Sequence, residues 1–204
     1  NMKPGAVDWK RIFQERKVRW FHTGGIFTAL SDSCAEVAYE AMKTAHEAGT
    51  VVSYDLNFRS KLWSSKKAIE ETKKLVPFID VLIGNEEDFQ KVLGFQVEGT
   101  DEHLKQLPID GYKRMVQQVV KAYPHIQAVG TTLREVVSGL VNNWSAIMYY
   151  DGAFYHSRKY ENLEIEDRVG GGDGFCSGFV YGLLHGMTPQ ECVEMGAAHG
   201  ALLQ

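Results

Sequence analysis

The sequence lacks the features that mark several large classes of protein. Its three cysteines, Cys34, Cys176 and Cys192, are widely spaced and form no Cys-x-x-Cys pair, which favours free thiols in a reducing compartment. No apolar run approaches the ~20 residues that a membrane helix requires. The first residues, "NMKPGAVDW", lack the charged and then apolar pattern of a signal peptide. We therefore expect a soluble, cytoplasmic protein.

An excess of basic charge is also missing. The chain has 22 Lys and Arg against 26 Asp and Glu, a net charge of −4, and a nucleic-acid-binding surface needs a basic field. Its seven histidines are scattered without metal-ligand spacing, so we interpret them as surface or packing residues. We expect neither nucleic acid nor a membrane as a partner. A phosphate site would have to be built locally, from backbone amides and a few basic residues.

Strand-like and helix-like segments alternate along most of the chain. Its 204 residues, 44% of them hydrophobic, suit one large domain or one with a small appendage, and no linker or internal repeat divides them. After an amphipathic start at 7–16, the predicted order is strand 18–25, helix 31–49 with Ser31 as N-cap and Gly49 as C-cap, strand 50–59, helix 66–76 stopped by Pro77, strand 79–84, a helix from about 86, helix 109–123 and strand 126–133. Helices at 173–185 and 189–203 close the chain.

The rhythm changes between residues 136 and 160, where β-prone runs are split at Asn142-Asn143 and Asp151-Gly152. This pattern predicts an antiparallel meander. The fold class is therefore α/β, with a mostly parallel central sheet flanked by helices and an antiparallel extension.

Polar residues follow three of the predicted strands. In parallel sheets, ligands bind outside the carboxyl ends of the strands. We expect one cleft to be lined by Asp55, Asn57 and Arg59 after one strand, Asn85 after the next, and Thr131 and Thr132 after the third.

The stretch "DRVGGGDGF" places three glycines and an aspartate before a helix. Amide groups of Gly170–Gly172 can turn toward one point at the positive end of the helix dipole, where they would receive anionic oxygens. Asp173 is placed to accept a proton from an attacking hydroxyl. A tight turn with an N-capping aspartate is the alternative, and spacing alone does not separate the two. Neither GxxxxGK[ST] nor GxGxxG is present.

Longer stretches carry a family resemblance. "DRVGGGDGFCSGFVYGLL" resembles the C-terminal signature of ribokinase-like (PfkB) carbohydrate kinases. "FHTGGIFTALSD", "VSYDLNFRSKLW", "IGNEEDFQKVLGF" and "TTLREV" are similar to the 2-keto-3-deoxygluconate kinases (2-dehydro-3-deoxygluconokinases) of that superfamily. The resemblance implies a central sheet flanked by helices, with a small β lid, and transfer of the γ-phosphate of ATP, with Mg²⁺, to 2-keto-3-deoxygluconate to give its 6-phosphate.

The resemblance also implies roles in the glycine loop. Asp173 would be the general base, Gly170, Gly171 and Gly172 the anion hole for the γ-phosphate, and Asp167 an organiser of the loop and of a hydrated metal. Arg168 stands where the wider superfamily has Thr or Pro, but it suits the ketodeoxygluconate branch. Gly174 replaces the commoner Ser or Ala.

Two further motifs point to the substrate and the metal. "DLNFR" supplies Asn57 and Arg59, and a guanidinium suits bidentate binding of the carboxylate of an acidic sugar or of a phosphate; the alternative is a structural pair of Arg59 with Asp55 or another acid. The family motif Asn-x-x-Glu near the magnesium and phosphates corresponds to Asn85 and Asp88, with a carboxylate one methylene shorter. Without the family, these acids would serve as first-turn helix acids.

The motifs that contact the nucleotide in the family match this sequence only in part. "TTLREV" corresponds to a nucleotide-contacting Thr-Leu-Gly stretch, so Thr132 and Leu133 match while Arg134 replaces the glycine. Ala197 stands where many relatives have Asn.

Glycines recur every fourth residue at 174, 178, 182 and 186. Such spacing also occurs in membrane helix dimers, but this segment is too short and interrupted to span a bilayer. We predict close packing of this helix against the sheet or a neighbouring helix.

Three alternatives remain: another PfkB sugar kinase of the fructokinase or ribokinase type, a nucleotide-binding oxidoreductase, and a non-catalytic remnant or inactive fragment that only binds nucleotide. The resemblance begins partway into the family, since no N-terminal strands, Gly-Gly substrate motif or β lid precede "WFHTGG", and it stops at "GALLQ". We therefore expect residues 1–204 to be a partial kinase core that binds sugar poorly, turns over negligibly and self-associates, with a homo-oligomer among its forms.

Overall fold

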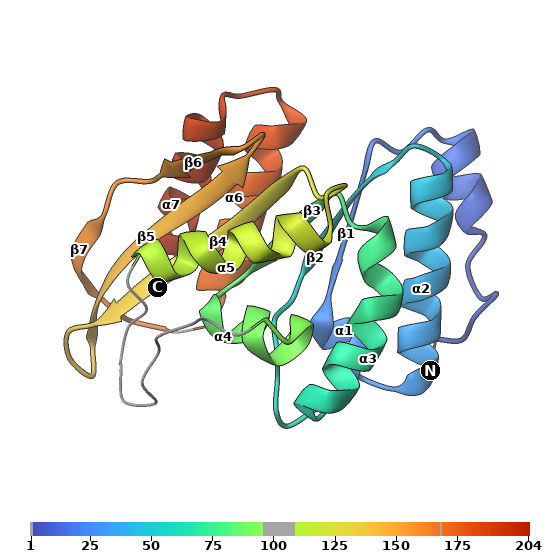
Figure 1. Cartoon of the computed structure of the whole chain (residues 1–204), viewed down its shortest axis with the longest axis horizontal. Helices are drawn as coiled ribbons and strands as arrows, with labels where there is room; N and C mark the ends of the chain where they lie inside the picture. Colours follow the sequence, from blue (N-terminus) through green and yellow to red (C-terminus); the bar gives the residue numbers. More distant parts are fainter. Residues whose placement is uncertain (1, 96–108, 168) are drawn as a thin grey trace. The chain divides into compact units, whose positions relative to one another are not determined.

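The computed structural model describes residues 2–95, 109–167 and 169–204 (Figure 1). The chain divides into two compact units, residues 1–127 and 128–204. Each unit is described by itself below.

Three parallel strands form the sheet of the first unit. They are β1 (Trp20–Gly24), β2 (Val51–Asp55) and β3 (Val81–Gly84), with β2 between the other two. Gly24 lies opposite Asp55, and Asp55 lies opposite Ile83. Because the strands are parallel and in this register, their carboxyl ends meet at one edge, as predicted.

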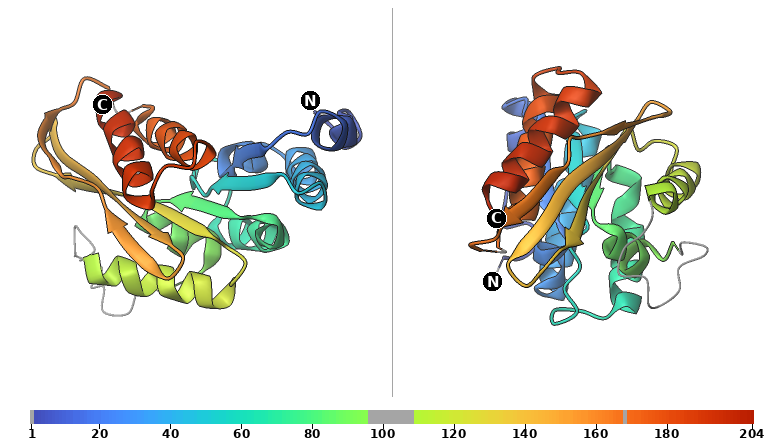
Figure 2. Two further views of the ribbon diagram at one scale, coloured as in Figure 1. Left: turned by 90° about the horizontal axis from the view of Figure 1, so that it is seen from above. Right: turned by 90° about the vertical axis from the view of Figure 1, so that its left-hand side faces the viewer.

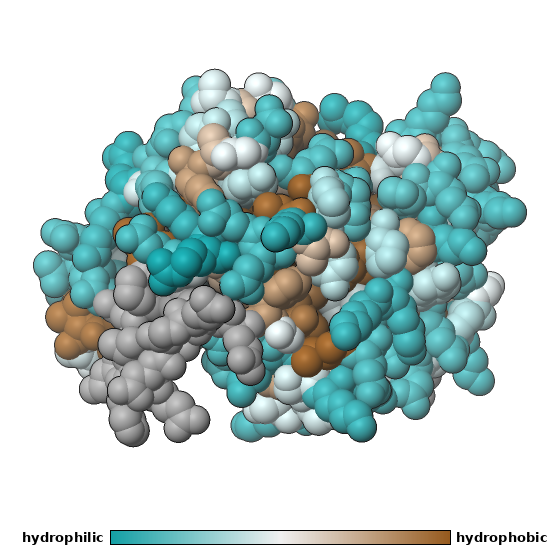
Figure 3. Space-filling view, viewed as in Figure 1, coloured by the Kyte–Doolittle hydropathy of each residue, from teal (hydrophilic) through white to brown (hydrophobic). Residues whose placement is uncertain are grey.

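One helical segment precedes β1, and others follow each of the three strands. They are π-helical η1 (Arg11–Glu15), α1 (Gly25–Ala29), α2 (Asp32–Glu47), α3 (Ser65–Leu75), the 3-10 turn η2 (Val76–Phe78), α4 (Glu86–Asp88), π-helical η3 (Phe89–Leu93) and α5 (Ile109–Ala122). The helices α2 and α3 lie side by side (Figure 1), and α2 also packs on β1 and β2. The face seen in Figure 3 is mostly hydrophilic over these two helices.

Serine hydroxyls begin the two long helices after β1 and β2. The Ser31 Oγ accepts the Cys34 N–H (3.2 Å), and the Ser64 Oγ accepts the Lys67 N–H (3.3 Å). Gly49, directly after the C-cap residue of α2, has a φ of +74°, a conformation that favours glycine. The predicted N-cap of α2, Ser31, is therefore confirmed, whereas the C-cap residue is Ala48, one position before the predicted Gly49.

The second unit contains an antiparallel sheet. Its strands are β4 (Ala128–Val136), β5 (Val141–Tyr150), β6 (Ala153–His156) and β7 (Tyr160–Glu164). In the meander predicted for residues 136–160, the antiparallel pairing of β5 with β6 is confirmed, and Asp151-Gly152 makes the turn between them with φ of +46° and +83°. The strand β4, predicted over 126–133, also pairs antiparallel with β5. The strand β7 was not predicted, and it pairs with β5 rather than with β6.

The expected turn at Asn142-Asn143 is wrong, since both residues lie inside β5. Asn142 sits opposite Val136 on one side and Leu163 on the other. The Asn143 side chain donates to Glu135 Oε2 (3.0 Å) and accepts the Asn162 N–H (2.9 Å). Partners on the neighbouring strands therefore override the turn preference of asparagine.

Two helices, α6 (Gly171–Leu184) and α7 (Pro189–Leu202), pack against one another and cover one face of this antiparallel sheet (Figure 2). A Cβ on Gly178 would lie 2.5 Å from the Met195 carbonyl oxygen, and one on Gly182 would lie 3.0 Å from the Cys192 Cα. A Cβ on Gly174 would lie 2.9 Å from the His199 carbonyl oxygen, so packing explains glycine there. The predicted close packing is confirmed. Gly186 is separate, because it follows the helix with a φ of +66°.

Among the described residues, no helix combines the length and the apolar character needed to cross a bilayer.

Candidate active site

The first part of the candidate site is the carboxyl edge of the first unit's sheet, where two glycines bring backbone into contact with backbone. A Cβ on Gly25 would collide with the Leu56 carbonyl oxygen, and one on Gly24 would lie 2.8 Å from the Asp55 carbonyl oxygen. The "HTGG" sequence therefore allows β1 to end directly against the "DLNFR" segment. The sequence analysis quoted these glycines only for the family resemblance, although a double glycine at the end of a strand signals such an approach.

The "DLNFR" segment leaves β2 in a restrained conformation. Asn57 has a φ of +32°, which asparagine tolerates better than most residues. Its amide donates to Asp55 Oδ2 (3.3 Å), and the exposed Arg59 donates from Nη1 to the Phe58 carbonyl oxygen (3.0 Å). In the ranges that the structure describes, no ion pair includes Arg59. The positive charge of Arg59 nevertheless lowers the pKa of the nearby Asp88 carboxyl. Ligand binding by Arg59 therefore stays a prediction beside the alternative of a structural pair with Asp55 or another acid.

Asp88, the last residue of the "NEED" segment, points inward rather than toward solvent. Asp88 is only 5% exposed. Its Oδ1 accepts the Phe58 N–H (2.8 Å), its Oδ2 accepts the Asn85 N–H (3.0 Å), and its own N–H donates to Asn85 Oδ1 (3.0 Å). Burial raises the pKa of the Asp88 carboxyl, and the N–H groups of Asn85 and Phe58, together with the positive charge of Arg59, oppose the rise. This carboxylate binds backbone on both of its oxygens.

The second part of the candidate site is the glycine loop of the second unit. The N–H groups of Glu166 and Asp167 both donate to the Gln204 carbonyl oxygen (2.7 and 2.9 Å), and Asp167 Oδ1 accepts the Val169 N–H (2.9 Å). Gly170 has a φ of +99°, a left-handed conformation that requires glycine. Arg168, which the resemblance places in the ketodeoxygluconate branch, lies outside the described residues. The interactions of Asp167 and Gly170 shape the loop immediately before α6.

The start of α6 is left without a side-chain cap. Thr188 and Glu191 form a complete capping box at α7, whereas the N-cap of α6, Gly170, makes no such bond. The first amides of an α-helix have no acceptor within the helix, so those of α6 can point at an anion. Gly172 and Asp173 are both exposed. No atom lies within 4 Å of where a Cβ on Gly172 would be, so packing does not explain glycine there, whereas close approach of a ligand would.

The residues expected to contact nucleotide lie on β4. Thr131 and Thr132 were expected after the third strand, but this is wrong: they and Leu133 lie inside β4, because pairing with β5 extends that strand to Val136. Thr131 is fully buried, and its Oγ1 has no hydrogen-bond partner in the part of the chain that the structure describes. Thr132 and Leu133 are half-buried.

The predicted site residues thus form two groups. Asn57, Arg59, Asn85 and Asp88 meet at the edge of the first unit's sheet. Asp167, Gly170–Gly172 and Asp173 share the loop before α6, and Thr132 and Leu133 lie on a strand of the same unit. That the two groups line one cleft stays a prediction.

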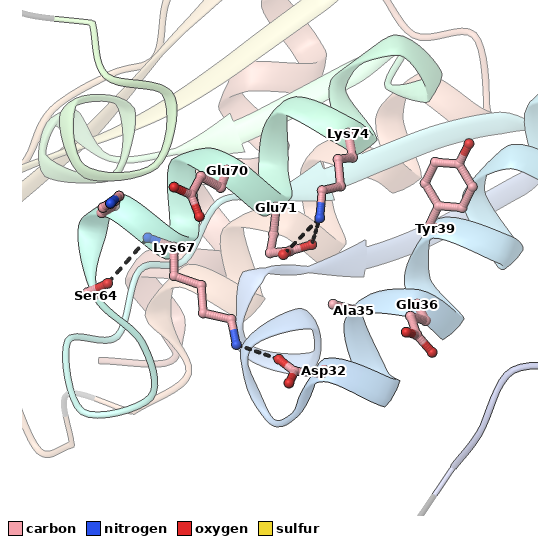
Figure 4. Close-up of a pocket in the computed structure, with 10 residues that line it drawn as sticks. Asp32, Ala35, Glu36, Tyr39, Ser64, Lys67, Glu70, Glu71 and Lys74 are labelled. Carbon is pink, nitrogen blue, oxygen red and sulfur yellow. Dashed lines mark hydrogen bonds and ion pairs between the residues drawn. The ribbon is translucent and has the colours of Figure 1, made fainter.

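A separate groove in the first unit lies between α2 and α3. It has a volume of about 820 Å³ and is lined by ten residues of α2, α3 and the turn before α3. Lys67 pairs with Asp32 across it, and Lys74 pairs with Glu71 (2.9 Å; Figure 4). None of its lining residues is a predicted site residue. Because it lies between two charged helix surfaces and four of its charged residues form ion pairs with one another, we interpret it as charged helix surface rather than as a ligand site.

No group of three or more metal-ligating side chains occurs among the residues that the structure describes. Mg²⁺ bound mainly through phosphates and water needs only one or two carboxylates. Both oxygens of Asp88 accept backbone N–H groups, whereas Asp167 Oδ2 takes part in none of the hydrogen bonds described for the loop. Asp167 could thus hold a hydrated Mg²⁺, and the role of Asp88 near the metal stays a prediction.

A mixed α/β fold with a glycine-rich loop opening a helix is the ribokinase-like arrangement. Residues 8–203 match the model of the pfkB family carbohydrate kinases. The chain belongs to this family.

Three relatives show which sugar kinases of the family this chain is similar to. The chain is 31% identical over 182 residues to a 2-dehydro-3-deoxygalactonokinase of Haloferax volcanii, with 89% of this chain and 50% of the relative covered. It is 28% identical over 181 residues to a 5-dehydro-2-deoxygluconokinase of Clostridium perfringens, with 88% and 47% covered. It is similar in structure to a 2-dehydro-3-deoxygluconokinase from Thermotoga maritima, with a TM-score of 0.89, 38% identity, and 99% and 59% of the chains covered. The chain thus spans about half the length of the curated relatives it matches.

Proposed function

We propose that the protein is an ATP-dependent kinase that phosphorylates 2-keto-3-deoxygluconate at its 6-hydroxyl. The observation that carries the proposal is the start of α6, where a glycine loop without a side-chain cap is followed at once by an exposed carboxylate, Asp173. The family supports phosphoryl transfer. The names of the three relatives, all kinases of keto-deoxy sugar acids or closely related sugars, support the substrate class.

In the proposed reaction, Asp173 accepts the proton of the sugar hydroxyl as its oxygen attacks the γ-phosphorus. The new P–O bond forms while the bond from the γ-phosphorus to the β–γ bridging oxygen breaks, and ADP leaves. Amides of Gly170–Gly172 would stabilise the charge on the transferring phosphoryl group, helped by the positive end of the α6 dipole. Bound Mg²⁺ would neutralise charge on the β- and γ-phosphates, with Asp167 holding its water shell.

The other group of residues would bind the substrates. Arg59 offers a guanidinium for the sugar carboxylate or for a phosphate. Asn57 and Asn85 would contact ATP. Thr132 and Leu133 would contact the nucleotide. A neutral sugar has no carboxylate for Arg59 to bind, so the acidic series is the favoured substrate class.

The test is ADP release by the native protein across a panel of sugars. The panel contains the 2-keto-3-deoxy acids of the gluconate and galactonate series, 5-dehydro-2-deoxygluconate, fructose and ribose. Among these sugars, we expect a keto-deoxy sugar acid to give the highest turnover, however small the turnover of residues 1–204 is. Asp173→Asn should lower kcat by about 10²–10⁴-fold while ATP affinity changes little, because the base acts on the acceptor hydroxyl. Preferred turnover of fructose or ribose would favour another PfkB sugar kinase. A variant that retains more than about a tenth of kcat would remove Asp173 from the role of base.

A further inference from the structure

The Asp88 carboxylate connects two segments that both supply proposed substrate-binding residues. It reaches the backbone of Phe58, 30 positions earlier in the chain, and also closes a reciprocal pair of hydrogen bonds with Asn85. The ends of β2 and β3 are joined here as well, because the Leu56 N–H donates to the Ile83 carbonyl oxygen (2.8 Å). Asp88 therefore holds the peptide that leads from β2 into Arg59.

The surroundings of Asp88 leave it little freedom to turn outward. A Cβ on Gly84 would lie 3.3 Å from the Asp88 Cβ and 3.1 Å from the Leu56 Cδ1. A side chain at the end of β3 would therefore crowd the side chains of Leu56 and Asp88. Tight packing on one side and backbone donors at both oxygens direct this carboxylate toward the loop.

Arg59 depends on the same peptide unit. Its Nη1 donates to the Phe58 carbonyl oxygen, while the Phe58 N–H donates to Asp88. Both backbone groups of Phe58 are thus engaged, one by the buried acid and one by the exposed guanidinium. Fixing Phe58 limits the directions that the Arg59 side chain can take before a ligand arrives, which reduces the ordering cost of binding.

We infer that Asp88 is a positioning residue that orients Arg59 through the backbone of Phe58, and thereby sets the preference for an acidic over a neutral sugar. This inference rests on the proposed function, and it gives Asp88 a role other than metal binding. Asp88 is expected to touch neither the sugar nor the metal.

Asp80, directly before β3, offers a matched control for Asp88, which follows the same strand. Asp80 Oδ2 accepts the Val52 N–H (2.8 Å) across 28 positions, near the amino end of β2. Asp80→Asn therefore perturbs the same kind of long-range hydrogen bond between a carboxylate and a backbone amide. This bond lies at the amino end of β2, whereas Arg59 follows the carboxyl end of that strand. The Asp80→Asn variant measures the effect of general destabilisation.

The experiment compares Asp88→Asn, Asp80→Asn, Arg59→Ala and the double variant Arg59→Ala/Asp88→Asn in the native protein. We expect Asp88→Asn to raise the KM for the sugar acid by about tenfold or more, the effect of losing one charge-assisted contact, and to reduce the acidic-over-neutral preference. Asp80→Asn should leave that preference unchanged. The double variant should show no further loss of preference beyond Arg59→Ala, since both changes remove one interaction. The Mg²⁺ concentration for half-maximal activity should stay within about twofold.

Three results would overturn the inference: equal preferences in Asp88→Asn and Asp80→Asn, additive losses in the double variant, or a shift in Mg²⁺ requirement without a change in preference. Amide hydrogen exchange of the wild-type protein gives an independent reading if Asp88→Asn does not fold. The Phe58 amide should then be protected about as well as the Val52 amide, and rapid exchange at Phe58 would refute the inference. If no keto-deoxy sugar acid is phosphorylated by the wild-type protein, the proposed function fails, and the exchange measurement alone decides whether Asp88 holds this loop.

Discussion

Two glycines of α6 separate the proposed catalytic role of this helix from its packing role. A Cβ at Gly172 would meet nothing within 4 Å, whereas a Cβ at Gly178 would lie 2.5 Å from the backbone oxygen of Met195. Gly172→Ala should therefore fold normally, and it should be more stable by about 0.4–1 kcal/mol because alanine restricts the unfolded chain. Gly178→Ala should lose about 1–3 kcal/mol through overpacking, since backbone on α7 would have to move.

Activity should change in the opposite order. The methyl group of Gly172→Ala would enter the space proposed for the γ-phosphate, and loss of one such donor interaction costs about 10²–10³-fold in rate. Gly178 faces α7 rather than the loop, so the folded fraction of Gly178→Ala should keep a kcat near that of the wild type. Urea unfolding followed by circular dichroism measures the first effect, and coupled ADP release measures the second.

The outcome that refutes this reasoning is specific. If Gly172→Ala loses as much stability as Gly178→Ala, glycine at 172 serves the fold, and the observation on which we base the anion hole disappears. If Gly172→Ala keeps more than about a tenth of the wild-type kcat/KM, the phosphate does not approach this peptide closely. Either result would return the loop to the alternative of a tight turn with an aspartate cap.

Three further predictions concern single side chains. Arg59→Ala should raise the KM for the sugar acid by about tenfold or more and narrow its advantage over a neutral sugar; equal losses for both sugars in steady-state assays would mean that Arg59 positions phosphate instead. Thr188→Ala removes the hydroxyl that accepts the Glu191 N–H and should cost about 1 kcal/mol in urea unfolding, while Thr188→Ser should restore most of it; no difference between the two variants would mean that this cap contributes nothing measurable. Burial raises the pKa of the Asp88 carboxyl in the folded protein above 3.8, so the folded protein binds the carboxyl proton more tightly than the unfolded chain does. Protonated Asp88 therefore stabilises the folded state below about pH 4, and this stabilisation is lost as the pH rises through the raised pKa. Urea midpoints between pH 4 and 7 should therefore fall relative to those of Asp88→Asn as pH increases, and a relative rise would contradict the assigned direction.

Local signals predicted much of the secondary structure and the loop that we propose as the catalytic centre. Ser31 begins α2 as expected because its hydroxyl needs only an amide three residues away. The glycine run before Asp173 was recognisable because a left-handed residue and exposed helix amides depend on neighbouring residues alone. The family was recognisable for the same reason, since its motifs are short and contiguous.

The tertiary structure decided what depends on distant partners. Asn142-Asn143 reads as a turn, but strands on both sides hold it within β5. Asp88 reads as a first-turn acid or a ligand near the metal, yet its direction is set by a backbone amide 30 residues away. The four-residue glycine spacing predicted close packing, but only the position of α7 separates Gly178, where a side chain would collide, from Gly172, where space is open. Sequence determines which conformations and contacts a residue can adopt, and the packing of distant segments selects among them, because side-chain direction and free volume are properties of the folded chain.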